Sequence, residues 1–206
     1  KWKTRWTAIE GARGYFDKIT EELVDPARLS ASPDSFTQGI ARAYRVYETA
    51  LFANNRTDFA HLQSIVHGLL LQPEHSGALM NEIRYVLVDE YQDTNYVQEQ
   101  LLLKLAEQTG NLCVVGDEDQ SLYRFRGATV RNILEFPSRF PKCPVVRLTT
   151  NYRSHRAIVE RYDRWMASAD WSNPRGVPFR FEKTIQADPN GAHPDYPSVI
   201  SIWGQD

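Results

Sequence analysis

Apolar side chains recur every three or four positions over the first third of the chain, the spacing that gathers them on one face of a helix. The pattern predicts three helices, at residues 7–23, 36–51 and 59–70. Asn54 and Asn55 interrupt the second helix, and the third stops before Pro73, as expected for residues that tend to end helices. We therefore expect the first 75 residues to be entirely helical.

From residue 84 onwards the apolar positions form short continuous runs, the pattern of strands that are buried on both faces. The predicted strands are residues 85–88, 112–115, 145–148 and, near the end of the chain, 198–203. Between the first two lies a helix that Thr94 or Asn95 can cap and Gly110 can end. Another helix is expected at about residues 155–167. This alternation predicts an α/β fold with a parallel sheet, preceded by an all-helical subdomain.

Polar residues directly follow each of the first three predicted strands. The first strand ends in Asp89 and Glu90, the second in Gly116 and Asp117, and the third in the sequence NYRS at residues 151–154. In open parallel sheets, ligands bind at the carboxyl ends of the strands. The sequence therefore predicts a ligand site where these strand ends meet.

The composition is that of an ordinary globular domain: 206 residues, 42% hydrophobic and 24% charged, with a formal net charge of −2. This excludes a histone-like polycation but not other nucleic-acid-binding proteins. The charges are unevenly distributed: residues 81–130 carry nine acidic and four basic side chains, and residues 131–183 carry five acidic and eleven basic. Such a division fits a cation site beside a polyanion, although two ordinary solvated faces would produce it as well.

Two cysteines, Cys113 and Cys143, are too few for a disulfide scaffold and exclude a CxxC-type zinc site. Both stand among aliphatic residues, so we expect buried, reduced thiols in an intracellular, cytoplasmic protein. The sequence contains no apolar run of about 18 residues and no signal-peptide pattern at its start. We therefore expect no membrane partner.

The adjacent acids Asp89 and Glu90 carry the most informative chemistry. At the carboxyl end of a buried strand, one carboxylate can hold a hydrated Mg²⁺ while the other orients and deprotonates a water molecule. Phosphoryl transfer needs this division, because a metal has to neutralise charge while a second group positions the nucleophile. A helix cap or a solvated loop also places acids after a strand, so the pair alone leaves both interpretations open.

A second segment, after the strand at residues 112–115, combines amide, aromatic and basic side chains. Gln120 can sense a terminal phosphate. Tyr123 and Phe125 alternate with arginines that include Arg126, a combination suited to stacking on bases while pairing with phosphates. Either ring could instead belong to the core.

The third segment, after the strand at residues 145–148, contains Tyr152, which can stack on a purine, and Arg153, which can reach a phosphate. The sequences DEYQDT, GDEDQSLYRFRGA and NYRS, in this order, resemble motifs II, III and IV of the UvrD-like superfamily 1 DNA helicases. The resemblance runs from about residue 36 to residue 160, more than half of the chain.

The resemblance implies an ATP site that uses Mg²⁺. In it, Asp89 would bind Mg²⁺ and Glu90 would act as the catalytic base on water. Gln120 would contact the γ-phosphate, and Arg153 would supply positive charge to the same phosphate. Tyr152 would stack on the adenine.

The resemblance also implies a site for single-stranded DNA and its junctions with duplex. Tyr123 and Phe125 would meet the bases, and Arg126 would connect that contact to the ATP site. The family often has tryptophan at the position of Phe125, so stacking there would be weaker. Gln92 and Asp93 would link the ATP site to the movement of the motor.

The fold implied by the resemblance is a partial RecA-like parallel sheet, that is, a P-loop NTPase fold without its P-loop. Residues 1–55 would form the helical insertion of the first motor lobe, residues 56–154 the rest of that lobe, and residues 155–206 the beginning of the second lobe. None of the eleven glycines is followed by lysine, so the phosphate loop GxxxxGK[ST] is absent. We therefore expect an internal piece of a helicase that is inactive alone and that self-associates through exposed sheet edges.

Three functions remain open from the sequence. The first is part of an ATP-dependent helicase that moves 3′ to 5′ on single-stranded DNA and unwinds duplex. The second is a non-catalytic module that binds single-stranded DNA or another partner. The third is a helicase joined to a nuclease that lies outside this sequence. The set Asp89, Glu90, Gln120 and Arg153 favours the first, because a pure scaffold has no chemical need for it.

Overall fold

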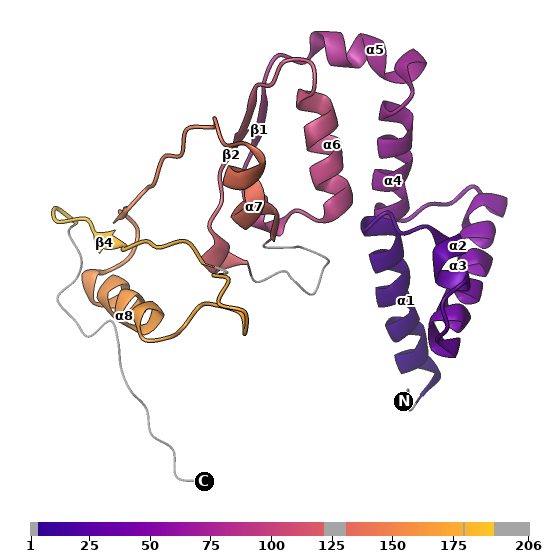
Figure 1. Cartoon of the computed structure of the whole chain (residues 1–206), viewed down its shortest axis with the longest axis horizontal. Helices are drawn as coiled ribbons and strands as arrows, with labels where there is room; N and C mark the ends of the chain where they lie inside the picture. Colours follow the sequence, from indigo (N-terminus) through magenta and orange to yellow (C-terminus); the bar gives the residue numbers. More distant parts are fainter. Residues whose placement is uncertain (1–3, 122–130, 179, 192–206) are drawn as a thin grey trace. The chain divides into compact units, whose positions relative to one another are not determined.

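The computed structural model describes residues 4–121, 131–178 and 180–191. The chain divides into two compact units, residues 1–133 and residues 134–206. Figure 1 follows the chain through both units. None of the helices among the described residues has the length and apolar character needed to cross a membrane.

The first unit begins with five helices: α1 (Arg5–Glu21), α2 (Pro26–Ser30), α3 (Ser35–Ala53), α4 (Phe59–Leu70) and α5 (Pro73–Glu82). The helices predicted at residues 7–23, 36–51 and 59–70 are confirmed as α1, α3 and α4. Helices α2 and α5 were not predicted, and both begin at a proline. Proline ends a helix that runs into it, but its fixed φ angle favours the first position of a new helix.

The helices pack through a core between α1 and α3. Ile19, Ile40 and Tyr44 form a buried cluster, against which Phe16 and two other apolar side chains are packed. The Tyr44 hydroxyl lies 3.0 Å from Thr20 Oγ1. Helix α4 packs on α1 and on a later helix, α6 (Tyr96–Ala106).

A β–α–β unit follows these helices. Helix α6 (Tyr96–Ala106) connects β1 (Val86–Val88) to β2 (Leu112–Val114), and the two strands are parallel, with Val88 opposite Val114. Asn95 caps α6 through its side chain, and Gly110 has a left-handed φ of 66° in the turn after it. The first two predicted strands, the helix between them and its Asn95 cap are therefore confirmed, although each strand is shorter than predicted and α6 ends at Ala106, before the predicted end at Gly110.

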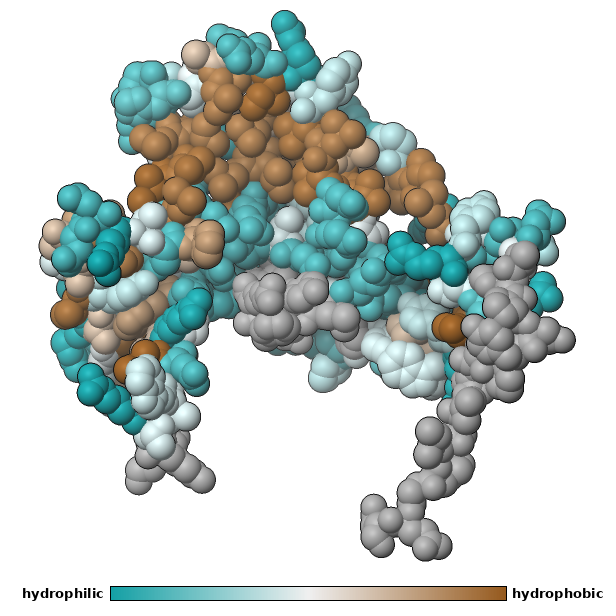
Figure 2. All heavy atoms as spheres, turned by 180° about the vertical axis from the view of Figure 1, so that it is seen from behind, coloured by the Kyte–Doolittle hydropathy of each residue, from teal (hydrophilic) through white to brown (hydrophobic). Residues whose placement is uncertain are grey.

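The strand pair has one face that the described residues leave largely uncovered. Side chains alternate between the two faces of a strand, and Tyr85 and Leu87 are 72% and 76% exposed. Cys113 pairs with Leu87 and is exposed too, so its predicted burial is wrong. Cys143 is only half-buried. Figure 2 shows a broad apolar area at the top of the view, in the part of the first unit that holds α5 and the strands.

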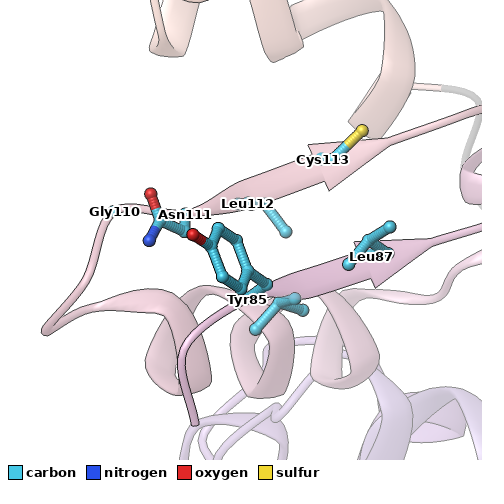
Figure 3. Close-up of a pocket in the computed structure, with 7 residues that line it drawn as sticks. Tyr85, Leu87, Gly110, Asn111, Leu112 and Cys113 are labelled. Atoms are coloured by element: carbon cyan, nitrogen blue, oxygen red, sulfur yellow. The ribbon is translucent and has the colours of Figure 1, made fainter.

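The same face carries a hollow at the amino ends of the strands, shown in Figure 3. Its lining consists of Tyr85, Val86, Leu87, Gly110, Asn111, Leu112 and Cys113. The polar residues singled out in the sequence follow the opposite, carboxyl ends of these strands. The hollow is therefore separate from the predicted ligand site.

Helix α7 (Arg131–Arg139) begins in the first unit and ends in the second. The second unit also contains β3 (Thr150–Asn151), α8 (Arg156–Ala167) and β4 (Gln186–Ala187), with β3 and β4 parallel. The strand predicted at residues 145–148 is wrong: Val145, Val146 and Leu148 are 63–82% exposed and precede β3. Extended backbone becomes a strand only by hydrogen bonding to a neighbour, and here Thr150 and Asn151 make that pairing.

The helix predicted at residues 155–167 is confirmed as α8. The strand predicted at residues 198–203 lies outside the described residues. Mixed helices and small parallel sheets make this an α/β protein. The RecA-like assignment and the lobe boundaries after residues 55 and 154 stay predictions.

Candidate functional site

The carboxyl ends of β1 and β2 meet at one edge of the strand pair. Beyond the ladder, the Val115 N–H donates to the Val88 carbonyl (2.8 Å), and the Tyr91 N–H donates to the Val115 carbonyl (2.9 Å). These two bonds hold the turn after β1 against the turn after β2. As a result, Asp89 and Glu90 lie next to the segment that begins at Gly116.

Asp89 and Glu90 are both exposed at this edge. The Glu90 N–H donates to Asp89 Oδ1 over 2.9 Å, which orients the Asp89 carboxylate. Glu90 has φ 51° and ψ 42°, a left-handed conformation that is uncommon for residues other than glycine. Such backbone strain is concentrated at functional sites, where surrounding contacts maintain it. The hydrogen bonds of the next residues supply those contacts.

Gln92 is the central connector of the site. It lies in the short 3₁₀ helix η1 (Tyr91–Asp93) and is only 1% exposed. Its Nε2 donates to Glu90 Oε2 over 2.6 Å, and its Oε1 accepts from the Asp117 N–H over 3.0 Å. A single buried amide therefore ties the Glu90 carboxylate to the end of β2.

Asp117 continues this chain to Gln120. The Asp117 side chain caps the 3₁₀ helix η2 (Glu118–Gln120) by accepting from the Asp119 N–H over 3.1 Å. Its other oxygen, Oδ2, accepts from Gln120 Nε2 over 2.8 Å. Glu90, Gln92, Asp117 and Gln120 are thus joined by consecutive hydrogen bonds, and the exposed Gln120 amide is fixed at the same edge as the two acids.

Asp93 is the third acid of the turn after β1, following Asp89 and Glu90. Burial, and to a smaller extent the charge of Glu90, raises the pKa of Asp93 above its usual value. Its Oδ1 is shielded from solvent and has no hydrogen-bond partner among residues 4–121, 131–178 and 180–191. The Asp93 N–H donates to the Glu90 carbonyl over 2.8 Å, which closes the turn between Glu90 and Asp93.

The other predicted site residues lie in the second unit or outside the described residues. Tyr152 and Arg153 belong to the second unit, where both are exposed in the turn after β3. Asn151 Oδ1 shapes that turn by accepting from the N–H groups of Arg153 (2.9 Å) and Ser154 (2.8 Å). Tyr152 is 77% exposed, so its ring is accessible for stacking. The predicted DNA-binding residues lie outside the described residues; they are Tyr123, Phe125 and Arg126.

Acidic oxygens at this edge suit a hard cation such as Mg²⁺. Asp89 offers an exposed carboxylate that Glu90 N–H orients through one oxygen. The residues present therefore fit a Mg²⁺ ion held through Asp89. Within the described residues, the carboxylates of Asp117, Glu118 and Asp119 also lie within 4.8 Å of one another. Both carboxylate oxygens of Asp117, however, already accept hydrogen bonds from η2.

Sequence comparison shows the family of this chain. Residues 3–141 match the family of the UvrD/REP helicase N-terminal domain. This chain belongs to the UvrD/REP helicase family. Among curated proteins, the ATP-dependent DNA helicase PcrA of Staphylococcus aureus is 36% identical over 166 residues, and that of Staphylococcus epidermidis is 35% identical over the same length. Each match covers 80% of this chain and 23% of the relative, so the chain spans about a quarter of the length of these helicases.

Two residues that the sequence placed only at the end of the second strand gain a specific role in the structure. Asp117 fixes Gln120, and the available signal was an acid three residues before a glutamine, the spacing of a capped turn. Gly116 permits close approach of the two turns: a Cβ atom there would lie 2.6 Å from Gln92 Oε1 and 2.8 Å from Ile133 Cδ1. The need for glycine at position 116 is visible only in the tertiary structure, because the atoms that a Cβ would meet belong to distant residues.

Proposed function

We propose that this chain is part of an ATP-dependent DNA helicase that moves 3′ to 5′ on single-stranded DNA and unwinds duplex at its junctions. Membership of the UvrD/REP family supports this function. The observation that carries it is the hydrogen-bonded series Glu90–Gln92–Asp117–Gln120, which joins two strand ends through a buried amide. Solvated acids without a shared function have no need of such a connection.

Glu90 is the general base for the attacking water. Its Oε2 is fixed by Gln92, so Oε1 accepts the proton while the carboxylate keeps its orientation. Asp89 holds the Mg²⁺ ion of the nucleotide, whose charge neutralises the phosphates. The preformed turn keeps both carboxylates in place before substrate arrives, which lowers the reorganisation needed for hydrolysis.

Three further residues are assigned to the nucleotide. Gln120, fixed by Asp117, contacts the γ-phosphate, and Arg153 brings positive charge to the same group. Tyr152 stacks on the adenine through its exposed ring. Gln92 and its neighbour Asp93 couple the state of the nucleotide to movement of the motor, because Gln92 touches both turns of the site.

Single-stranded DNA is the proposed partner of the segment that follows η2. There, Tyr123 and Phe125 stack on bases, and Arg126 connects the bases to the ATP site; the proposal for these three rests on the sequence alone. The expected compartment is the cytoplasm.

The 206-residue chain is proposed to lack ATPase activity by itself, because it contains no GxxxxGK[ST] loop to bind the β- and γ-phosphates. A protein that carries this segment together with such a loop is the form in which hydrolysis is tested. The alternative, a non-catalytic module that binds single-stranded DNA, predicts DNA binding without hydrolysis even in that longer protein.

The decisive experiment compares Glu90→Gln, Asp89→Ala and wild type in the longer protein. We expect Glu90→Gln to bind ATP with normal affinity but to lose DNA-stimulated hydrolysis by about 10²- to 10⁴-fold, the range for a general base. Asp89→Ala should weaken Mg²⁺-dependent nucleotide binding. The matched control is Glu10→Gln, which neutralises an exposed glutamate of α1. Retention of hydrolysis in Glu90→Gln, or equal loss of ATP affinity in both site variants, contradicts these roles.

We also propose that the isolated chain self-associates through the uncovered face of β1 and β2. Tyr85, Leu87 and Val115 are 51–76% exposed on or beside this face, and Cys113 is exposed between them. Two parallel strands alone leave both outer edges without a strand partner in the described sheet. Apolar area of this kind is rarely left bare in a stable monomer.

A further inference from the structure

We propose that Asn132, in the first turn of α7, is a positioning residue that fixes the turn carrying Glu90 and Gln92. This inference rests on the proposed function, because it assigns the residue a part in the same hydrolytic site. Asn132 belongs to the first unit together with that turn. It lies 38 residues beyond its partner Thr94 in the sequence.

Asn132 reaches the turn through a buried amide. Its side chain is only 2% exposed, and Nδ2 donates to Thr94 Oγ1 (3.2 Å) and, at longer range, to the Thr94 carbonyl (3.4 Å). Thr94 is itself buried at 9% exposure. A buried amide that loses its partner costs more than the hydrogen bond contributed, so this contact resists opening.

Thr94 passes this restraint to η1. Its hydroxyl donates to the Tyr91 carbonyl over 2.7 Å, and its N–H donates to the same carbonyl over 3.2 Å. The Tyr91 ring is fully buried, and its hydroxyl donates to Glu99 Oε1 over 2.9 Å. Asn132, through Thr94, and α6, through Glu99, therefore both restrain Tyr91, the first residue of the short helix that presents Gln92.

The residue after Asn132 contacts the second turn of the site. Ile133 is 8% exposed. Its Cδ1 lies 2.8 Å from the position that a Cβ atom on Gly116 would take. The first turn of α7 consequently touches the segment after β1 through Asn132 and the segment after β2 through Ile133. Gln92 bridges the same two segments from the side of Glu90.

This geometry gives Asn132 a consequence for the Glu90 carboxylate. The two bonds of Gln92, 2.6 and 3.0 Å long, tolerate displacements of only a few tenths of an ångström before they weaken. Loosening η1 shifts Gln92 relative to Asp117 and frees the Glu90 side chain to rotate. Catalytic groups need placement within about 0.5 Å, so the effect falls on the hydrolytic step more than on nucleotide affinity.

Amide hydrogen exchange of the 206-residue chain tests the restraint directly. In Asn132→Ala, the N–H groups of Asp93, Thr94 and Asp117 should exchange about tenfold faster than in wild type, because they donate within or onto the turn. The N–H group of Val86, which donates to the Asn111 carbonyl at the amino end of the ladder, should change less than twofold.

A matched control exists at the opposite end of the strands. Asn111 Nδ2 donates to the Arg84 carbonyl over 2.9 Å, a side-chain amide to a distant backbone carbonyl, as in Asn132. Asn111→Ala should leave the exchange of Asp93, Thr94 and Asp117 unchanged. Equal acceleration of turn and ladder N–H groups in Asn132→Ala would mean a general loss of stability and would overturn the proposal, as would no acceleration in the turn.

Variants of Thr94 keep the test valid if Asn132→Ala does not fold. Thr94→Val preserves the shape of the side chain but removes the hydroxyl that accepts from Asn132 and donates to the Tyr91 carbonyl, and it should accelerate the same three N–H groups. Thr94→Ser retains the oxygen and should restore slow exchange. Identical exchange in the Val and Ser variants contradicts the assigned contact.

A kinetic measurement in the longer protein with a phosphate loop completes the test. Asn132→Ala should lower kcat for DNA-stimulated ATP hydrolysis about tenfold while KM for ATP changes less than twofold. A rise in KM with unchanged kcat would overturn the positioning role. If wild type hydrolyses no ATP, the proposed function fails, whereas the hydrogen-exchange result still decides whether Asn132 fixes the turn.

Discussion

Replacing Gly116 by alanine should destabilise the first unit far more than a glycine substitution ordinarily does. The added Cβ atom would lie 2.6 Å from Gln92 Oε1, 2.8 Å from Ile133 Cδ1 and 3.3 Å from the Gln92 backbone nitrogen. Atoms at the first two distances overlap, and Gln92 has little room to move because it is 1% exposed and bonded at both ends of its amide. The turn after β1 must therefore shift.

The cost follows from two physical contributions. Forcing an additional methyl group into a packed region costs about 1–3 kcal/mol. Displacing Gln92 also breaks its bond from the Asp117 N–H, a net loss of about 0.5–1.5 kcal/mol. We expect Gly116→Ala to lower the free energy of unfolding by roughly 2–4 kcal/mol, which corresponds to a melting temperature lower by roughly 5–15 °C for a chain of this size.

Thermal and urea unfolding followed by circular dichroism measures this change, with Gly68→Ala as the matched control. Gly68 lies inside α4, and no heavy atom stands within 4 Å of the place its Cβ would take. That substitution should stabilise the chain by about 0.5–1 kcal/mol, because glycine weakens helix interiors. The two substitutions therefore have opposite expected signs.

A double variant identifies the cause of the effect. Ile133→Val removes the Cδ1 atom that the new methyl group meets, so Gly116→Ala should cost less in that background than in wild type. An unfolding free energy of Gly116→Ala within 0.5 kcal/mol of wild type would refute the close approach of the two turns. Equal costs in both backgrounds would show that Ile133 takes no part in it.

Three further predictions concern other parts of the first unit. Burial, and to a smaller extent the charge of Asp17, raises the pKa of Glu21 from 4.5 to about 7. Between these pH values the folded state binds more protons than the unfolded state, so the free energy of unfolding falls as the pH rises. After allowance for the partial exposure of Glu21, we expect a loss of about 1–2 kcal/mol between pH 4.5 and pH 7. Glu21→Gln should flatten this dependence in urea titrations, and an unchanged slope contradicts the assignment. Asp58→Ala should cost about 2–4 kcal/mol, because this helix cap also accepts from Tyr47 and the His61 ring; a loss below 1 kcal/mol in thermal unfolding would mean that these bonds contribute little. Leu87→Glu should abolish concentration-dependent sedimentation of the isolated chain, whereas Val46→Glu, on exposed α3 surface, should leave it unchanged; association that persists in Leu87→Glu rules out the strand face.

Local sequence determined the helices and the β1–α6–β2 unit. Apolar spacing gave α1, α3 and α4, and a capping asparagine marked the start of α6. These signals are reliable because they depend on neighbouring residues of the same element. The same local reasoning placed Asp89 and Glu90 after β1 and a polar turn after β2, since parallel strands bring their carboxyl ends to one edge.

Residue pattern failed where the outcome depends on a distant partner. The apolar run at residues 145–148 has the composition of a buried strand, yet pairing in the second unit goes to Thr150 and Asn151. Cys113 stands among aliphatic residues in the sequence, but its place in the strand directs it to the uncovered face. A run of apolar residues shows that a segment can be buried, but it does not specify which other segment packs against it.

The sequence by itself therefore determined the family, the helical elements and the identity of the acids at the strand ends. Tertiary structure alone decided how those acids are held: by the Gln92 amide between Glu90 and Asp117, by the absence of a side chain at Gly116, and by the contact of Asn132 with Thr94. The physical reason is the range of the interactions. Helix propensity and capping act within a few residues, whereas a buried amide is satisfied by groups up to 38 residues away.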